Sequence, residues 1–289
     1  MKAHEQIIAP GAEEGWAYAD DGFFFGIGAF ETIAVSGQTP LFLDEHLTRM
    51  EETLKFFGIE AAHADLQALA LRACAELDPT GEWALKLTVA KRNRIASTRR
   101  NPYASPNAKR AFSCDFSTVR RNESSPLARM KTLAYAENII EKRRARERGI
   151  DEPLFLNTHG EVAEGTVSNI FAVIAGEVVT PPVSCGLLPG IMRRLAIDLT
   201  EAIERPFTPS ELATASEVFL TNSLMGAMPV TRLGETRFEP GHVSHMVNQA
   251  YAEKKHRRKK VVEKRSAKLV RNSPKPYRIS IKSRNRRLR

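Results

Sequence analysis

The pattern of apolar and polar positions predicts two strands in the first ninety residues of the chain. One is expected at residues 30–35 and the other at residues 84–90. Residues 91–107 lose this pattern, because they are basic and polar and contain proline, and we predict a loop there. Such a loop is a good place for a domain boundary. We therefore expect an N-terminal α/β domain in residues 1–108 and a C-terminal domain in residues 109–252.

Apolar residues at helical spacing predict the helices between these strands. Leu47, Met50 and Leu54 recur every three or four residues, and Asp44 precedes them as a candidate N-cap. This helix should end near Gly58, because glycine commonly follows the last turn of a helix. A second helix is predicted over residues 65–77.

The second part of the chain also mixes strands and helices. Strands are expected at residues 112–119, 154–156, 218–221 and 228–230, and helices at 133–148, 191–203 and 240–255. Ala175 and Gly176 separate two apolar runs, which is typical of a β-hairpin. The strands come in runs mixed with helices, and no GxGxxG motif begins a helix. The pattern therefore favours the α+β class over a doubly wound sheet.

The composition is that of a globular protein without a membrane span. Of 289 residues, 42% are hydrophobic and 27% are charged, and the length favours two domains. No apolar run approaches the length of a membrane helix, and the N-terminus lacks the apolar core of a signal peptide. The three cysteines, an odd number, favour a reducing cytoplasm, and their spacing fits no zinc site, so no metal is expected.

The net charge of +9 comes from the C-terminal end of the chain. Residues 253–289 hold seventeen basic and two acidic residues, whereas residues 1–252 hold 26 basic and 32 acidic ones. Such a tail could bind phosphate backbones without sequence preference. No nucleic-acid module accompanies it, however, and Tyr277 is its only aromatic residue, so nucleic acid is not an expected partner. We predict a disordered extension.

Four stretches contain side chains that suit a cofactor site. Lys131 stands at the predicted start of a helix, and Glu164 opens a polar run just ahead of an apolar strand. Gly190 begins a helix whose free N–H groups would attract an anion. Residues 221–223 place three hydrogen-bonding side chains at the end of a strand. Each feature is common in proteins, and none identifies a site alone.

The order and spacing of these stretches resemble the class IV aminotransferase family, which has the two-domain fold of the fold-type IV pyridoxal-phosphate enzymes. The resemblance covers about residues 15–250. It rests on the motifs FGIGAFET, EHLTR, KTLAYAEN, EGTVSNIF, GIMR and FLTNSLM, which begin at residues 25, 45, 131, 164, 190 and 219. The family includes branched-chain aminotransferases, D-amino-acid aminotransferases and aminodeoxychorismate lyases. It implies a small N-terminal domain, a larger β-rich C-terminal domain, and pyridoxal 5'-phosphate between them.

The resemblance assigns two residues to the reacting end of the cofactor. Lys131 matches the lysine that forms the Schiff base, and an amine there can also act as acid or base. Glu164 matches the carboxylate beside the pyridine nitrogen, which keeps the ring protonated so that it can accept electrons.

The resemblance also implies a site for the cofactor phosphate. Arg49 matches the arginine that binds it, and the planar guanidinium suits a phosphate. The remaining residues that would contact the cofactor are Ser168, Asn169, Gly190, Ile191, Met192, Asn222 and Ser223.

Two positions depart from the family pattern. Ile27 stands where the family often has an acidic residue, and Ala134 stands where it often has asparagine. Neither is a reacting group, so these departures affect the hydrogen bonding of the site and leave the cofactor unchanged. No histidine is expected to be catalytic.

Two reactions remain open within the family. A lyase would convert 4-amino-4-deoxychorismate to 4-aminobenzoate and pyruvate, a step that belongs to folate biosynthesis, and an aminotransferase would act on a D-amino acid or a branched-chain amino acid. Residues 222–230, NSLMGAMPV, resemble the lyase version of the last loop and favour the lyase.

Two residues are expected to contact the small-molecule substrate. Phe30 stands where some D-amino-acid enzymes have a pocket tyrosine. Arg94 lies in an arginine-rich loop at residues 92–100, which could meet the carboxylates of a substrate or could simply be solvated. The resemblance implies a homodimer with each active site near the interface.

Overall fold

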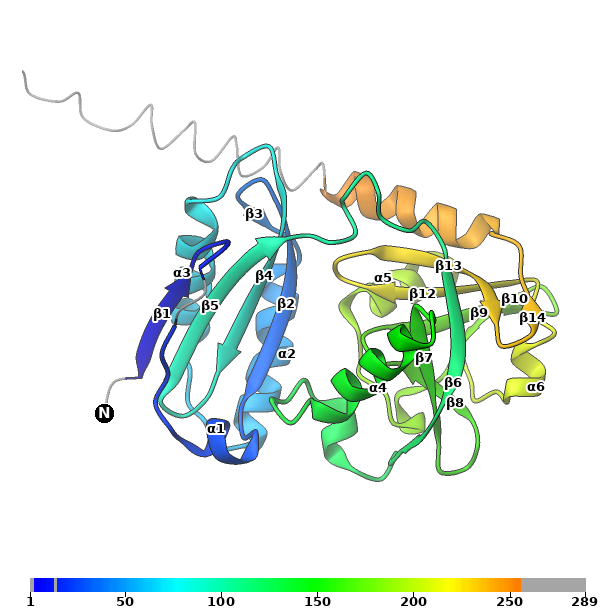
Figure 1. The fold of residues 1–289 in the computed structure, drawn as a ribbon, viewed down its shortest axis with the longest axis horizontal. Helices are drawn as coiled ribbons and strands as arrows, with labels where there is room; N and C mark the ends of the chain where they lie inside the picture. The colour runs from blue at the N-terminus through cyan, green and yellow to red at the C-terminus, as the bar shows by residue number, and fades with distance from the viewer. Residues whose placement is uncertain (1–2, 13–14, 256–289) are drawn as a thin grey trace, which may run out of the picture.

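A computed structural model describes residues 3–12 and 15–255 of the chain. These residues form two β-sheets with helices packed against them (Figure 1). Within the described part, no helix is long and apolar enough to cross a membrane. The basic tail was predicted to start at residue 253. Residues 253–255 are helical, and the rest of the predicted tail lies outside the described residues.

The first sheet has the strand order β1-β5-β4-β2-β3. Its strands are β1 (His4–Ile8), β2 (Ala29–Ser36), β3 (Thr39–Pro40), β4 (Glu82–Val89) and β5 (Asn93–Arg100). The helices of this part are α1 (Asp21–Phe25), α2 (Leu43–Phe56) and α3 (His63–Ala75). The strands predicted at residues 30–35 and 84–90 are confirmed as β2 and β4.

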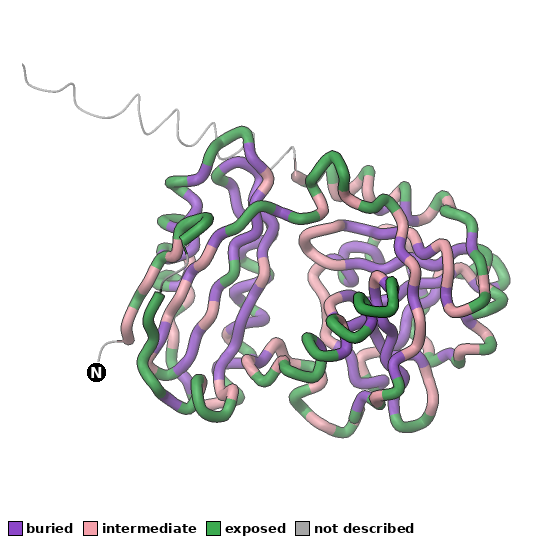
Figure 2. Tube along the Cα trace, in the orientation of Figure 1, coloured by how far each residue is buried: buried purple, intermediate pink, exposed green. Residues whose placement is uncertain are grey.

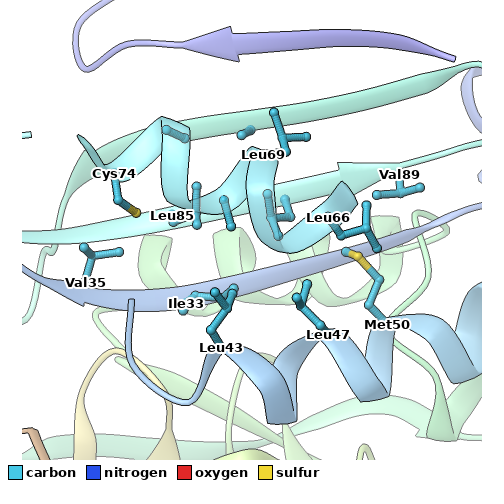
Figure 3. Close-up of a cluster of buried hydrophobic side chains, with 14 of the residues drawn as sticks. Ile33, Val35, Leu43, Leu47, Met50, Leu66, Leu69, Cys74, Leu85 and Val89 are labelled. Atoms are coloured by element: carbon cyan, nitrogen blue, oxygen red, sulfur yellow. The ribbon is translucent and has the colours of Figure 1, made fainter. Parts of the chain in front are cut away.

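Helices α2 and α3 pack on one face of this sheet and form its core. Leu47 and Met50 of α2 and Leu66 of α3 are fully buried against Ile33 and Leu85 of the strands (Figure 3). Burying a side chain of this size contributes about 1.5–3 kcal/mol. The helical spacing of apolar residues in the sequence is therefore what holds the two helices to the sheet.

Two local predictions for this part were wrong. Residues 93–100 form strand β5, whereas a loop was predicted, and β5 pairs with both β1 and β4. Asp44 is not the N-cap of α2 but lies in its first turn, while Phe42 precedes the helix with a left-handed backbone (φ 54°). The negative charge of Asp44 still suits the positive end of the helix dipole.

The second sheet contains the remaining strands of the described residues. Its order is β11-β10-β9-β12-β13-β6-β7-β8, with β14 paired to β13. The strands are β6 (Phe112–Arg121), β7 (Glu152–Asn157), β8 (Val162–Gly165), β9 (Asn169–Ile174), β10 (Glu177–Thr180), β11 (Ile203–Glu204), β12 (Glu217–Asn222), β13 (Gly226–Leu233) and β14 (Thr236–Arg237). Ala175 and Gly176 have positive φ angles between β9 and β10, so the predicted hairpin is confirmed.

The helices of the second part differ from their predicted bounds by a few residues. They are η1 (Pro126–Arg129), α4 (Ala136–Glu147), η2 (Val183–Cys185), α5 (Ile191–Thr200), α6 (Pro209–Leu212) and a last helix at residues 242–255. Lys131 is not at a helix start, because α4 begins five residues later. Ile203 belongs to β11 and not to α5.

The fold is of the mixed α and β class, with two sheets side by side, as the resemblance implied (Figure 1). The chain leaves the first sheet at Arg100 and enters the second at Phe112, while the division into domains at residue 108 stays a prediction. Strands of both sheets are largely buried, whereas much of α4 faces outward (Figure 2).

Candidate active site

A cavity of about 930 Å³ is lined by residues of both sheets. Strands β2, β4 and β5 supply one side, and the segments around β8, β9 and β12 supply the other. All of the residues predicted to bind cofactor or substrate line it except Arg94. The fold therefore brings together motifs that are far apart in the sequence.

Lys131 reaches the cavity from an extended segment beside the start of β2. The backbone carbonyl of Lys131 accepts a hydrogen bond from the N–H of Phe30 at 3.0 Å, and Thr132 forms a β-bridge with Ala29. The Nζ atom lies 4.6 Å from the centroid of the Phe30 ring and 5.3 Å from that of Tyr135. The pairing with β2 thus fixes the backbone, and two aromatic rings enclose the amine.

The environment of Lys131 makes its neutral form more accessible than that of an exposed lysine. Burial lowers the pKa of Lys131 to about 8, and the positive charge of Arg49 adds to this effect against the negative charge of Glu31. No acidic side chain among the described residues forms an ion pair with the Lys131 ammonium group. An amine with this pKa can act as a nucleophile or a base near neutral pH.

Glu164 lies buried at the end of β8, where Arg121 holds its carboxylate. Arg121 Nη2 donates to Glu164 Oε1 at 3.0 Å, and the N–H of Leu188 donates to Oε2 at 3.0 Å. Burial raises the pKa of Glu164 to about 7, although the positive charge of Arg121 opposes this. The Arg121 guanidinium is itself fixed over the ring of Phe155, 4.1 Å from the centroid.

Tyr135 and Asn138 are cavity residues that the sequence alone did not single out. The Tyr135 hydroxyl and Asn138 Nδ2 both donate to the carbonyl of Thr166, at 2.7 and 2.8 Å. These bonds tie the Lys131 segment to the loop after Glu164. Both residues belong to the KTLAYAEN motif, so their place in that motif was the signal that could have identified them.

Arg49 faces the cavity from α2 with its guanidinium fixed on two sides. Its Nε and Nη2 donate to the two oxygens of Glu31 at 2.8 and 2.7 Å, and Nη1 donates to the carbonyl of Pro189 at 2.9 Å. Burial alone would raise the pKa of Glu31, but Arg49 and His46 outweigh it and hold the pKa below its ordinary value. Glu31 therefore stays ionised and positions Arg49 beside the start of α5.

The start of α5 offers backbone donors to the same region. Gly190 precedes the helix without any side-chain cap, so the N–H groups of Ile191 and Met192 have no partner within the helix. A Cβ at Gly190 would collide with Asn169 Oδ1. Only glycine therefore leaves room at this point, and the arrangement suits an anion.

The turn after β12 forms another part of the wall. Asn222 Oδ1 accepts from the N–H groups of Leu224 and Met225, both at 3.0 Å, and Nδ2 donates to the carbonyl of Val167 at 3.2 Å. The hydroxyl Oγ1 of Thr221 is buried in the cavity wall and has no hydrogen-bond partner. Asn222 thus shapes the turn, whereas Thr221 has a donor left for a bound molecule.

Ser168 and Asn169 line the cavity, but their side chains are engaged with the protein. Ser168 Oγ donates to Glu152 Oε1 at 3.0 Å, and Asn169 Nδ2 donates to the carbonyl of Leu188 at 2.8 Å. The fully buried Glu152 also accepts from Thr166 Oγ1 and from the N–H of Val167. Ser168 and Asn169 therefore brace the loop, and their predicted contacts with the cofactor stay predictions.

The two residues predicted to contact substrate have different positions. Phe30 lines the cavity and packs edge-on against Tyr135, with centroids 5.0 Å apart. Arg94 does not line it, because its guanidinium points to the other face of the sheet, 3.3 Å from Asp65 Oδ2 and 3.8 Å from Glu5 Oε1. The structure therefore gives no support to Arg94 as a substrate contact.

The residues present fit pyridoxal phosphate. That cofactor needs an amine for its aldehyde, a carboxylate for its ring nitrogen and donors for its phosphate. The cavity offers Lys131 and Glu164 for the first two needs. The unpartnered Thr221 hydroxyl, the start of α5 and Arg49 can supply the donors. Among the described residues no cluster of side chains could hold a metal ion.

The fold and this cavity fit an enzyme of the kind that works through a lysine and a phosphate-bearing cofactor. Comparison with known proteins is more specific. The chain belongs to the class IV aminotransferase family, whose model matches residues 28–233 and which uses pyridoxal phosphate.

Relatives of this chain include both lyases and aminotransferases. An aminodeoxychorismate lyase of Bacillus subtilis (strain 168) is 29% identical over 239 residues, which are 76% of this chain and 82% of that protein. A D-alanine aminotransferase of Bacillus licheniformis is 26% identical over 75% of this chain and 83% of its own length. The crystal structure of the 4-amino-4-deoxychorismate lyase of Pseudomonas aeruginosa matches with a TM-score of 0.74 and 29% identity, over 84% of this chain and 96% of that one.

Proposed function

We propose that this chain is a pyridoxal-phosphate-dependent 4-amino-4-deoxychorismate lyase that releases 4-aminobenzoate and pyruvate. The similarity to the lyases of Bacillus subtilis and Pseudomonas aeruginosa supports the proposal. The observation that carries it is the segment at residues 222–230, which resembles the lyase version of this loop. In the structure, Asn222, Ser223 and Leu224 of this segment lie in the cavity wall.

Lys131 would move the proton in this reaction. Pyridoxal phosphate, when bound, supplies an aldehyde for the substrate amine and a ring that accepts electrons. Lys131 then takes the proton from the carbon that bears the amine, and a pKa near 8 suits a base at neutral pH. The carbon–oxygen bond to the enolpyruvyl group breaks, the six-membered ring becomes aromatic, and the departing enolpyruvate gains a proton to become pyruvate.

Glu164 and its partners would hold the other side of the site. The pair with Arg121 and the bond from Leu188 keep the Glu164 carboxylate at one position in the cavity. A carboxylate there stabilises a proton on a neighbouring ring nitrogen. Phe30 and Tyr135 keep water away from Lys131, because their rings enclose its amine.

Incubation of the purified protein with pyridoxal phosphate and 4-amino-4-deoxychorismate tests this proposal. We expect 4-aminobenzoate, detected by its fluorescence, and pyruvate in equal amounts. Lys131→Ala is expected to abolish both products and the visible absorbance of the bound cofactor. A wild-type protein that takes up the cofactor but makes no 4-aminobenzoate contradicts the proposal.

An amino-acid aminotransferase is the second candidate, because the D-alanine aminotransferase covers the chain almost as fully as the lyase does. That reading predicts amine transfer from an amino acid to a keto acid. Measuring product formation from D-alanine and from leucine with 2-oxoglutarate separates the two activities.

We also propose that the enzyme is a homodimer, as the family resemblance implies, and light scattering on the purified protein checks the mass.

A further inference from the structure

Two cations in the cavity have no role in the site described so far. Lys86 lies on β4 and Arg99 lies on β5, and both line the cavity. Lys86 is paired in register with Ser97, and Arg99 with Ala84. Residues two apart on a strand share a face, so Lys86 and Arg99 project from the same face of the sheet.

Within the described residues, Lys86 and Arg99 line the cavity without acidic partners, as Arg120 and Lys131 do, whereas three other cavity cations are paired. Glu31 neutralises Arg49, Glu164 neutralises Arg121, and Glu152 forms an ion pair with Lys142. Neither Lys86 nor Arg99 forms an ion pair with an acidic side chain within the described residues. Two positive charges therefore face the cavity uncompensated, which favours an anionic molecule there.

Lys86 and Lys131 both lie close to the ring of Phe30. The Nζ atoms of Lys86 and Lys131 lie 4.9 and 4.6 Å from the centroid of the same Phe30 ring. Both amines therefore border the same ring, and Lys86 is close enough for its positive charge to contribute to the lowered pKa of Lys131. Burial lowers the pKa of Lys86, and the positive charge of Arg99 adds to this effect, so the two cations are also close to each other.

We propose that Lys86 and Arg99 bind the two carboxylates of the substrate and determine the specificity of the site. The proposal rests on the proposed function. In 4-amino-4-deoxychorismate one carboxylate lies across the ring from the amine, and the other belongs to the enolpyruvyl group on the carbon next to the amine-bearing one. With the amine placed at Lys131, Lys86 and Arg99 are the cations on strands of the first sheet that line the same cavity and could receive these carboxylates.

The same arrangement disfavours an ordinary amino acid. An α-amino acid such as alanine or leucine has a single carboxylate, so it leaves one of the two cations without an anionic partner. A branched-chain amino acid would also place an apolar side chain against two unpaired charges, which costs free energy. Lys86 and Arg99 would thus select a dicarboxylate over a monocarboxylate.

Chorismate is the probe that tests this inference, because it has a hydroxyl group in place of the amine and cannot react with the cofactor. We would measure its dissociation constant by calorimetry on the cofactor-loaded protein. Lys86→Met and Arg99→Gln are each expected to weaken binding about tenfold or more, the usual loss for a hydrogen bond to a charged group. The visible absorbance of the bound cofactor should be unchanged in both variants.

Arg100→Gln is the matched control. Arg100 is the next residue on β5, but its guanidinium stacks over Trp83, 3.8 Å from the ring centroid, and it does not line the cavity. This variant is expected to bind chorismate as the wild type does. Arg120→Gln tests the competing cation, since Arg120 also lines the cavity from β6.

The outcomes separate this inference from the proposed function. If the wild type makes 4-aminobenzoate while Lys86→Met and Arg99→Gln bind chorismate normally, the inference is wrong and the lyase activity stands. If the wild type makes none but both variants lose chorismate affinity, the dicarboxylate site stands and the lyase proposal fails. A loss in Arg120→Gln with none in Arg99→Gln overturns the assignment of Arg99.

Discussion

Two aromatic rings set the reactivity of Lys131. The rings of Phe30 and Tyr135 lie beside Nζ in place of water, which would otherwise stabilise the ammonium form. Burial acts on Glu164 in the same way and raises its pKa to about 7, while that of Lys131 falls to about 8. One buried cavity thus brings an acid and a base to the pH range in which proton transfer is efficient.

The first prediction is that cofactor uptake by the apoenzyme depends on pH. Only the neutral amine of Lys131 condenses with an aldehyde, and its pKa is lowered to about 8. The rate of uptake should therefore rise as the pH increases towards about 8 and should level off above it. Stopped-flow measurement of the visible absorbance after mixing with pyridoxal phosphate gives this profile.

Two observations serve as controls for this profile. Lys131→Ala should show no visible band at any pH, which links the band to this side chain. An ordinary exposed lysine titrates near 10.4. A midpoint close to that value would contradict the environment described for Lys131.

At the scale of elements, helix α2 connects the core of the first sheet to the site. Its buried face contributes Leu47 and Met50 to the core, and the same helix presents Arg49 to the cavity. Since Glu31 of β2 fixes Arg49, the packing of α2 on β2 and the position of a predicted phosphate ligand depend on each other.

Leu47→Ala is therefore expected to destabilise the protein. Leu47 is fully buried among apolar side chains (Figure 3), and truncation leaves a cavity, so we expect a loss of about 2–5 kcal/mol in the free energy of unfolding. Urea denaturation followed by circular dichroism measures it. Glu52→Ala on the exposed side of α2 is the matched control and should change stability little.

Most strands and helices were predictable from apolar spacing, and the exceptions have a common reason. Strand β5 was predicted as a loop because its sequence is polar and basic, yet Ala96 packs into the core while Arg99 faces the cavity. Ala96 is the one β5 residue in the core, and Arg94 and Thr98 on the same face are polar, so β5 does not show the alternation of a half-buried strand. The extended segment around Lys131 was likewise missed, because its pairing with β2 is a tertiary contact.

At the scale of the whole molecule, the motifs predicted which residues line the cavity better than the arginine-rich segment did. The residues from Arg49 to Ser223 assigned by resemblance do meet in one cavity. Arg94 was selected from the same strand as Arg99, but its side chain points the other way. Which face of β5 meets the second sheet depends on how the two sheets lie together, and local sequence does not carry that information.

The last prediction concerns where the functional part of the chain ends. The helix at residues 242–255 holds the turn between β12 and β13 in place. Asn248 Oδ1 accepts from the N–H of Ala227 at 2.8 Å, and the Tyr251 hydroxyl donates to the carbonyl of Ser223 at 2.9 Å. Lys255 forms an ion pair with Glu82 of the first sheet. Because this turn lines the cavity, the helix belongs to the functional unit.

Two truncations test this view. A chain that ends after Lys255 lacks most of the basic tail but keeps all of these contacts, so the visible cofactor absorbance and product formation should match those of the full chain. A chain that ends after Gly241 loses the contacts to Ser223 and Ala227 and should bind pyridoxal phosphate more weakly. Fluorescence titration with pyridoxal phosphate compares the two. If the first truncation loses the cofactor, the basic residues beyond Lys255 contribute to the site, and the functional unit does not end with the helix.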